Sequence, residues 1–215
     1  MERRSKPKRP LLPVAAIVGD GYGEQIYFQQ VKESVRAAHV QIRPELPNRS
    51  GKGGGFKRVF GKAKQLKAEG CDHVFCLVDM DVVYRERNLS TYQADKKQLE
   101  KQGVTVIESN PCFEVWFLLH FLRTSQLFDD CAGVEHALRH KTDLTDYSKE
   151  QKYMAGLSQR LSPRLTAHAI PNSLWLENQW LENQQHGGKF DYFPRCEVFR
   201  IFEALKIVPI QQRQD

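Results

Sequence analysis

The chain lacks the features that mark membrane proteins, disulfide scaffolds and zinc ribbons. No apolar run approaches the roughly 18 residues that a membrane helix needs, and the basic N-terminus has no apolar signal-peptide core. The five cysteines are odd in number and form no CxxC pair. We therefore expect a cytoplasmic protein whose thiols are reduced and mostly buried.

Several well-known catalytic and binding motifs are also missing. The glycine-rich stretch GKGGGFKR does not have the GxxxxGK[ST] spacing of a P-loop. His136 and His140 stand four residues apart, but no HExxH frame surrounds them. A nucleotide cradle is therefore not favoured, and a plain helix surface explains the two histidines better than a metal site. Nothing in the chain resembles a helix-turn-helix or an RNP motif.

The composition is that of a basic globular protein. The 215 residues include 32 Lys and Arg against 26 Asp and Glu, and 40% are hydrophobic, which is enough for a proper core. The net charge of +6 favours an acidic partner, nucleic acid first. A soluble protein that happens to be basic is the alternative.

Apolar runs alternate with helical patterns in the first half of the chain. We expect strands within residues 11–18, 40–46, 72–81 and 104–109, and helices over residues 23–39, 56–70 and 90–103. This alternation predicts an α/β fold, with a parallel sheet flanked by helices.

The second half is mostly helical. Residues 129–141, 147–161 and 196–208 have helical patterns, and the tandem WLENQWLENQ repeats one pentapeptide. Five residues advance a helix by about 500°, so its two tryptophans cannot share one face. We predict a disordered basic arm over 1–10, a core over 11–125 and a helical extension over 126–215, together forming one domain.

Acidic residues follow two of the predicted strands. Asp20 follows the first strand, and Asp79 and Asp81 end the strand HVFCLV. Residues i and i+2 of an extended chain point to the same side, and ligands of parallel sheets bind at the carboxyl ends of strands. These carboxylates therefore predict a Mg²⁺ site for phosphoryl or phosphodiester chemistry. Asp is also common where strands end, so a purely structural role is the alternative.

A basic segment offers contacts for a nucleic-acid backbone. Lys52, Lys57 and Arg58 lie in and just after the glycine-rich stretch. A solvated helix surface explains the same charges equally well.

The stretch ESNPCFEVWFLLHF places a carboxylate inside an apolar segment. We expect Asn110 to cap a helix, Pro111 to begin it and Glu114 to lie in its first turn, where the helix dipole favours negative charge. Glu114 then faces the acidic cleft or a cation such as Lys149. A buried Glu held for structure alone is the alternative.

Four motifs together resemble the RloB-like family. They are VGDGYGEQIYF, CLVDMD, ESNPCFEVWFLLHF and YSK, and the likeness runs from about Val14 to Leu205. That family is usually grouped with Toprim-type domains, so the resemblance implies a Toprim-like fold. It also implies Mg²⁺ (or Mn²⁺) bound by a first-strand glutamate and a DxD.

Carried onto this chain, the resemblance assigns the DxD to Asp79 and Asp81. The first-strand glutamate is replaced by Asp20, which is one methylene shorter, and Glu24 matches a second acid of the opening motif. Lys149 lies in YSK and is expected to contact a phosphate or to neutralise a buried carboxylate. Glu24 or Glu114 would act as base or support the metal ligands.

Two functions follow from these observations. The first is a Mg²⁺-dependent Toprim-like nuclease that cleaves DNA or RNA, including tRNA, in a prokaryotic anti-phage or restriction-associated system. The second is a catalytically degenerate nucleic-acid-binding or regulatory subunit that partners an AAA-type ATPase. The intact DxD favours the enzyme, and the Asp20 replacement favours the binding subunit.

Overall fold

A five-stranded sheet forms the centre of the protein. The computed structural model describes residues 12–34, 39–47, 55–185 and 193–207, so the predicted basic arm lies outside the described residues. The strand order is β2-β1-β3-β4-β5, with β1 to β4 parallel and β5 antiparallel at the edge. The strands are β1 (Val14–Val18), β2 (Gln41–Glu45), β3 (His73–Asp79), β4 (Thr105–Asn110) and β5 (Arg195–Cys196).

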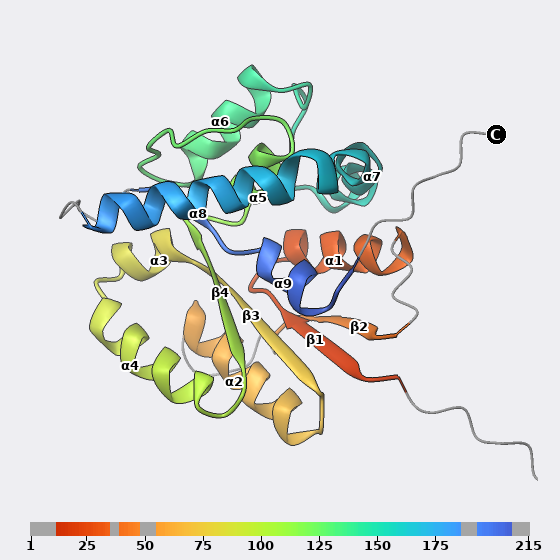
Figure 1. Ribbon diagram of the computed structural model, residues 1–215, viewed down its shortest axis with the longest axis vertical. Coiled ribbons are helices and arrows are strands. Elements are labelled where there is room, and N and C mark those ends of the chain that lie inside the picture. The colour runs from red at the N-terminus through yellow and green to blue at the C-terminus, as the bar shows by residue number, and fades with distance from the viewer. Residues whose placement is uncertain (1–11, 35–38, 48–54, 186–192, 208–215) are drawn as a thin grey trace, which may run out of the picture.

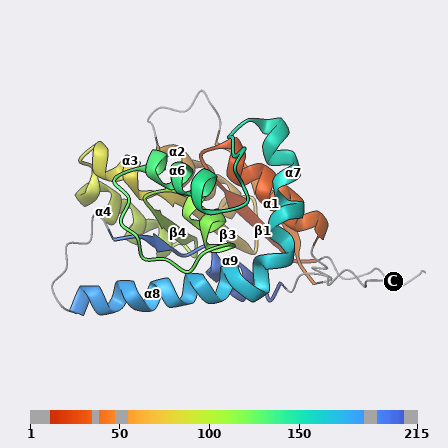
Figure 2. The same ribbon diagram turned by 90° about the horizontal axis from the view of Figure 1, so that it is seen from above.

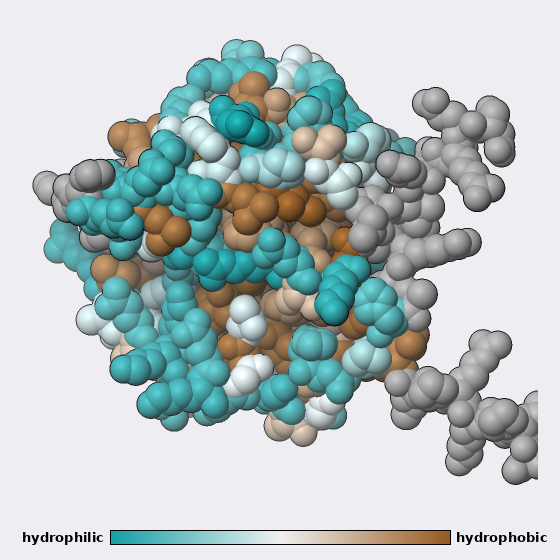
Figure 3. Space-filling view, viewed as in Figure 1, coloured by the Kyte–Doolittle hydropathy of each residue, from teal (hydrophilic) through white to brown (hydrophobic). Residues whose placement is uncertain are grey.

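Helices cover both faces of this sheet (Figure 1; Figure 2). One face carries α2 (Phe56–Ala68), α3 (Met80–Arg85) and α4 (Leu89–Glu100). The other carries α1 (Tyr22–Ser34), α5 (Glu114–Leu119), α6 (Cys131–Lys141), α7 (Gln151–Leu161), α8 (Ile170–Gln185) and α9 (Phe199–Ala204). A 3₁₀ turn (Ser162–Arg164) and a π turn (Leu165–Ala169) join α7 to α8. On the one face that Figure 3 shows, hydrophilic residues predominate around the rim and hydrophobic residues gather near the centre.

Each strand contributes side chains to both apolar layers. In β1, Ala15 and Ile17 face the layer with α1, whereas Ala16 and Val18 face the layer with α2. A parallel sheet buried on both faces needs such continuous apolar strands, so the VAAIV run forms β1 rather than a half-exposed strand. No helix in the described ranges is long and apolar enough to cross a membrane.

The predicted α/β architecture is confirmed. All four expected strands and all three expected helices of the first half are present, as is the mostly helical C-terminal part. The helix α8 and the two turns before it were not among the predicted helices, and neither were two short elements, α3 and the two-residue strand β5. Both α3 and β5 are too short for a periodic pattern, and β5 depends on pairing with β4.

The conformation expected for the DxD is wrong beyond Asp79. β3 ends at Asp79, which is the N-cap residue of α3, and Asp81 lies in the first turn of that helix. The two carboxylates are therefore placed by a strand-to-helix turn and not by an extended chain. The Asp81 amide donates to the Pro111 carbonyl (3.0 Å), which ties this turn to the end of β4.

The predicted start of the apolar helix is also wrong. Asn110 belongs to β4 because it pairs with Arg195 of β5, and the Asn110–Pro111 peptide bond is cis. The helix α5 begins only at Glu114, so Asn110 does not cap it and Pro111 is not its first residue. Glu114 does lie in the first turn, as expected.

The cysteines do not all remain reduced. Cys112 and Cys131 form a disulfide across a separation of 19 residues. Cys71, Cys76 and Cys196 are free and buried, as predicted. The expectation failed for the pair because neither spacing nor number reveals which residues the fold brings together.

The tandem pentapeptide forms most of α8, and its two copies have opposite environments. Leu176 in the first copy is completely buried, whereas Leu181 in the second is 45% exposed. Trp175 packs against the core, and Trp180 lies against Arg195, with the guanidinium 3.8 Å from the ring centroid. The five-residue repeat therefore does not repeat in space, as the helical geometry predicts.

This difference gives a matched pair of substitutions. Leu176→Ala should lower the free energy of unfolding by about 3 kcal/mol, since it removes a fully buried side chain. Leu181→Ala, at the same place in the second copy, should cost less than about 0.5 kcal/mol. Urea denaturation of both variants measures the difference, and equal losses would contradict the helical register of α8.

Candidate functional site

The carboxyl ends of β1 and β3 meet where the chain changes direction across the sheet. From β1 the chain passes through α1 to β2 on one side, and β3 lies on the other side of β1. Val18 is level with Cys76, so the segments that follow both strands emerge at the same edge. Such a switch point is where α/β sheets bind ligands.

Asp79 is half-buried at this edge, at the end of β3. Its Oδ1 accepts a hydrogen bond from the Phe113 amide at 2.8 Å. Burial raises its pKa well above the usual range, and the negative charges of Glu24, Glu114 and Asp81 act in the same sense. These four carboxylates therefore interact with one another, and like charges in one buried site favour protonation or a bound cation.

Glu24, from the first turn of α1, is the charge that acts most strongly on Asp79. Burial raises the pKa of Glu24 to about 7, with further contributions from Glu114 and Asp20. Two glycines make room for it. A Cβ at Gly19 would lie 2.7 Å from the Glu24 Cβ, and a Cβ at Gly21 would lie 2.7 Å from Oε2.

Asp81 contains a buried oxygen without a partner. Its Oδ1 makes no hydrogen bond to any of the described residues. Burial raises the pKa of Asp81, although the backbone amides of Val82 and Cys131 and the charge of Arg85 oppose this effect. A buried, unsatisfied carboxylate oxygen that faces other acids is suited to bind a cation.

Asp20 lies further out than the other acids. Its side chain is 40% exposed, and its Oδ1 is 3.2 Å from Arg58 Nη2. Within the described residues, neither the set Asp20, Asp79 and Asp81 nor the set Glu24, Asp79 and Asp81 has oxygens that all lie within 4.8 Å of one another. Holding one ion with all three acids of either set would therefore require these side chains to move closer together on binding.

Glu114 has cationic and hydrogen-bonding partners. Lys149 Nζ is 2.8 Å from Glu114 Oε1 and 3.1 Å from Glu135 Oε1. The Tyr147 hydroxyl donates to Glu114 Oε1 at 3.2 Å. Burial raises the pKa of Tyr147, and the adjacent Glu114 adds to the effect. Of the two contacts expected for Lys149, the structure therefore has the one that neutralises a buried carboxylate.

The basic residues expected to bind phosphate lie beside this edge or outside the described residues. Arg58 is engaged with Asp20, and Lys57 is exposed on α2. Lys52 lies outside the described residues. Their contact with a nucleic acid stays a prediction.

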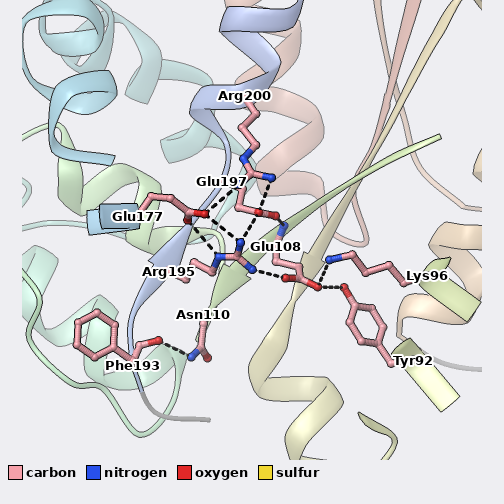
Figure 4. A network of polar contacts seen from close by, with 9 residues as sticks. All are labelled: Tyr92, Lys96, Glu108, Asn110, Glu177, Phe193, Arg195, Glu197 and Arg200. Carbon is pink, nitrogen blue, oxygen red and sulfur yellow. Dashed lines mark hydrogen bonds and ion pairs between the residues drawn. The ribbon is translucent and has the colours of Figure 1, made fainter. Parts of the chain in front are cut away.

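A second buried network of charges was missed in the sequence (Figure 4). Three glutamates and three cations from β4, β5, α4, α8 and the start of α9 form it. They are Glu108, Glu177, Glu197, Lys96, Arg195 and Arg200. Glu177 lies in the tandem repeat and Glu108 in a predicted strand, so neither residue stands out before β5 is placed beside β4.

Arg195 is the centre of this network. Its Nη1 is 2.7 Å from Glu108 Oε2, and its Nη2 is 2.7 Å from Glu197 Oε1. Its Nε donates to Glu177 Oε2 at 3.1 Å. One guanidinium therefore contacts three glutamates, using the planar fork that suits arginine to such pairing.

Glu108 receives two further donors. The Tyr92 hydroxyl and Lys96 Nζ contact its Oε1 at 2.6 and 2.7 Å. Burial acts to raise the pKa of Glu108, but Lys96, Tyr92 and Arg195 together hold it below its ordinary value. This carboxylate is therefore charged and fully compensated, unlike the acids at the carboxyl edge.

Two adjoining clefts run along α3 and α4. One, of about 440 Å³, is lined by Lys96, Glu108, Trp180 and Arg195 among others. The other, of about 790 Å³, includes Asp81, Arg85 and Arg87. Both are lined by Tyr84, Leu89, Gln93 and Asn110. The charge network and the acidic edge therefore border one continuous depression.

Comparison with known proteins gives one match. The model of the RloB-like protein family matches residues 15–205, which is most of the chain. Comparisons with curated proteins and with solved structures find no match.

The raised pKa of Glu24 predicts a pH-dependent stability difference. Because its native pKa of about 7 exceeds the ordinary value of 4.5, the native state binds this proton more tightly than the unfolded state. Glu24 therefore costs stability as the pH rises from about 4.5 to 7. Glu24→Gln should match the wild-type melting temperature at pH 4.5 and exceed it at pH 8.

Glu33→Gln provides the control, because Glu33 is an exposed carboxylate on the same helix. Its difference from wild type should not change with pH. Melting curves of the three proteins from pH 4.5 to 8 make the comparison. A Glu24→Gln difference that is constant over this range would contradict the burial of that carboxylate.

The central arginine predicts a large loss of stability on substitution. Arg195→Met leaves three buried glutamates without their shared cation, and breaking buried pairs of this kind costs about 3 to 5 kcal/mol. Arg160→Met removes an ion pair with the mostly exposed Asp146 and should cost far less. Chemical denaturation measures both values, and a loss below 1 kcal/mol for Arg195→Met would refute the network's role.

Proposed function

The chain belongs to the RloB-like protein family, and we propose that it is a Mg²⁺-dependent nuclease of Toprim-like type. The reaction is phosphodiester hydrolysis of DNA or RNA, including tRNA. Its site is the carboxyl edge between β1 and β3, where Glu24, Asp79 and Asp81 lie. Asp20 and Glu114 border that site.

The contrast between a buried set of carboxylates and a half-buried set carries this proposal. Glu108, Glu177 and Glu197 are all paired with Lys or Arg. In the described parts of the chain, no basic side chain forms an ion pair with Glu24, Asp79 or Asp81. Half-buried acids that repel one another and have no such partners favour a bound cation from solution.

The donor atoms fit a hard divalent cation. All are carboxylate oxygens, which Mg²⁺ and Mn²⁺ prefer, and the Asp81 Oδ1 is buried without a partner. When bound, such a cation would neutralise charge on the phosphate and lower the pKa of a water molecule bound to it. The Phe113 amide keeps Asp79 oriented toward the site through its bond to Oδ1.

Glu24 is suited to move the proton of the attacking water. Its pKa of about 7 is close to the pH at which a general base works best. Gly19 and Gly21 allow its side chain to lie against the turn after β1. Glu24 therefore takes the catalytic part for which the shorter, more exposed Asp20 is poorly placed.

The cations near the site would bind the nucleic-acid backbone. Arg58 lies beside Asp20, Lys57 is exposed on the same helix, and Lys52 precedes them in the chain. The family resemblance further supports a role in a prokaryotic anti-phage or restriction-associated system. It also supports an AAA-type ATPase as the partner.

A second candidate is a nucleic-acid-binding or regulatory subunit without catalysis. The observation that favours it is the ion pair between Asp20 and Arg58, which neutralises the acid in the family's glutamate position. In that case the acidic edge still binds a cation, but no bond is cleaved.

Cleavage of supercoiled plasmid and of tRNA with Mg²⁺ or Mn²⁺ separates the two candidates. Asp79→Asn should reduce cleavage to background, and Glu24→Gln should reduce it by about 10²- to 10⁴-fold. Glu69→Gln is the matched control, because Glu69 lies at the opposite end of α2 and is 39% exposed.

Equal cleavage by Asp79→Asn and wild type would rule out this site. No cleavage by any of the proteins, alone or with the partner ATPase, together with retained nucleic-acid binding, would favour the regulatory subunit.

A further inference from the structure

The disulfide lies directly beside the acidic site. Cys112 follows the end of β4, and Cys131 is the first residue of α6. Cys112 is 1% exposed, whereas Cys131 is only partly buried. The other three cysteines are free, buried thiols, so this pair differs from them in being oxidised and in having one sulfur-bearing residue, Cys131, that is only partly buried.

One half of the disulfide adjoins a backbone amide that holds Asp79, and the other half lies near Asp81. The residue after Cys112 is Phe113, whose amide donates to Asp79 Oδ1 at 2.8 Å. The backbone amide of Cys131 lies near Asp81 and acts to lower the pKa of that carboxyl. The cross-link therefore fixes the relative positions of two segments that lie beside Asp79 and Asp81.

The surroundings of Cys131 suit both redox states. Its Sγ lies 3.0 Å from Glu114 Oε2 and 3.4 Å from Lys149 Nζ. A disulfide sulfur carries no hydrogen, so it cannot donate to Glu114, whereas a thiol in the same place can.

We propose that Cys112–Cys131 is a reversible oxidation site, exchanged by low-molecular-weight thiols, whose disulfide form keeps the acidic site ordered for a divalent cation. The redox change is independent of the proposed nuclease activity. Its consequence for cation binding rests on the proposed metal site.

The exchange proceeds through the more accessible sulfur. An external thiolate attacks Cys131 Sγ, the Cys112–Cys131 bond breaks, and Cys112 leaves as a thiolate that takes up a proton. A second external thiolate then attacks the outer sulfur of the mixed disulfide, releasing the external disulfide and the Cys131 thiolate, which also takes up a proton. Two electrons pass from the external thiols to the protein, and oxidised glutathione reverses both steps.

Alkylation of the full chain tests the redox site. The protein is equilibrated in buffers of reduced and oxidised glutathione, quenched, denatured and treated with iodoacetamide before intact mass measurement. The oxidised form should carry three alkyl groups and the reduced form five, because the chain has five cysteines of which two form the disulfide. Five groups in every buffer, or three in every buffer, would overturn the proposal.

The thermal shift produced by Mn²⁺ tests the consequence. The oxidised protein should bind Mn²⁺ at least about threefold more tightly than the reduced protein, since preorganised ligands lose less entropy on binding. The double variant Cys112→Ser/Cys131→Ser should behave as the reduced protein in all buffers. Cys71→Ser, which removes a free thiol, should retain the full redox effect.

Equal Mn²⁺ affinities in the two redox forms would overturn the link between the disulfide and the acidic site. Absence of any Mn²⁺ effect, with the three-to-five change intact, would instead overturn the proposed metal site and leave the oxidation site standing. Zinc retained by the reduced protein at one ion per chain would overturn the redox role and assign the pair to metal binding.

Discussion

The burial of negative charge is the constraint that shapes this protein. Two sets of carboxylates are wholly or partly removed from water, one beside β4 and one at the edge between β1 and β3, and the fold treats them in opposite ways. Around Glu108 every acid has a cation, and Arg195 alone contacts three glutamates. At the carboxyl edge, Glu24 and Asp79 have raised pKa values because burial and like charge act together. The acids around Glu108 link segments of the fold through ion pairs, whereas the acids at the carboxyl edge favour the binding of a cation.

The compensated set also explains how the C-terminal half joins the sheet. β5 pairs with β4 through only two residue pairs, which is little by itself. Arg195 of that strand contacts Glu108 of β4, which lies 87 positions earlier in the sequence. The same arginine lies over Trp180, so β4, β5 and α8 are linked by one side chain (Figure 4). Fixing β5 in turn holds Asn110 in β4 and so places the segment that carries Phe113.

Local patterns in the sequence were sufficient to predict the strands β1 to β4, but they did not predict β5 or the arrangement of the site. Apolar runs and helical spacing indicated β1 to β4, because their burial on both faces requires such runs. The pairing of β5, the disulfide and the partners of Glu108 depend on residues brought together from distant segments, which no local pattern contains. Asp79 and Asp81 were found from their position after a strand. Their actual placement depends on the start of α3.

The choice between Asp20 and Glu24 shows how a missing side chain can define a site. Glycine at positions 19 and 21 leaves the space that the Glu24 side chain occupies, since a Cβ at either would come within 2.7 Å of it. The longer acid from the helix therefore reaches back to the strand end, toward Asp79, while the shorter Asp20 turns to Arg58 at the surface. An acid that follows a strand directly is thus not always the one that enters the cleft. In this turn, helix geometry and the absence of two Cβ atoms decide which carboxylate is buried.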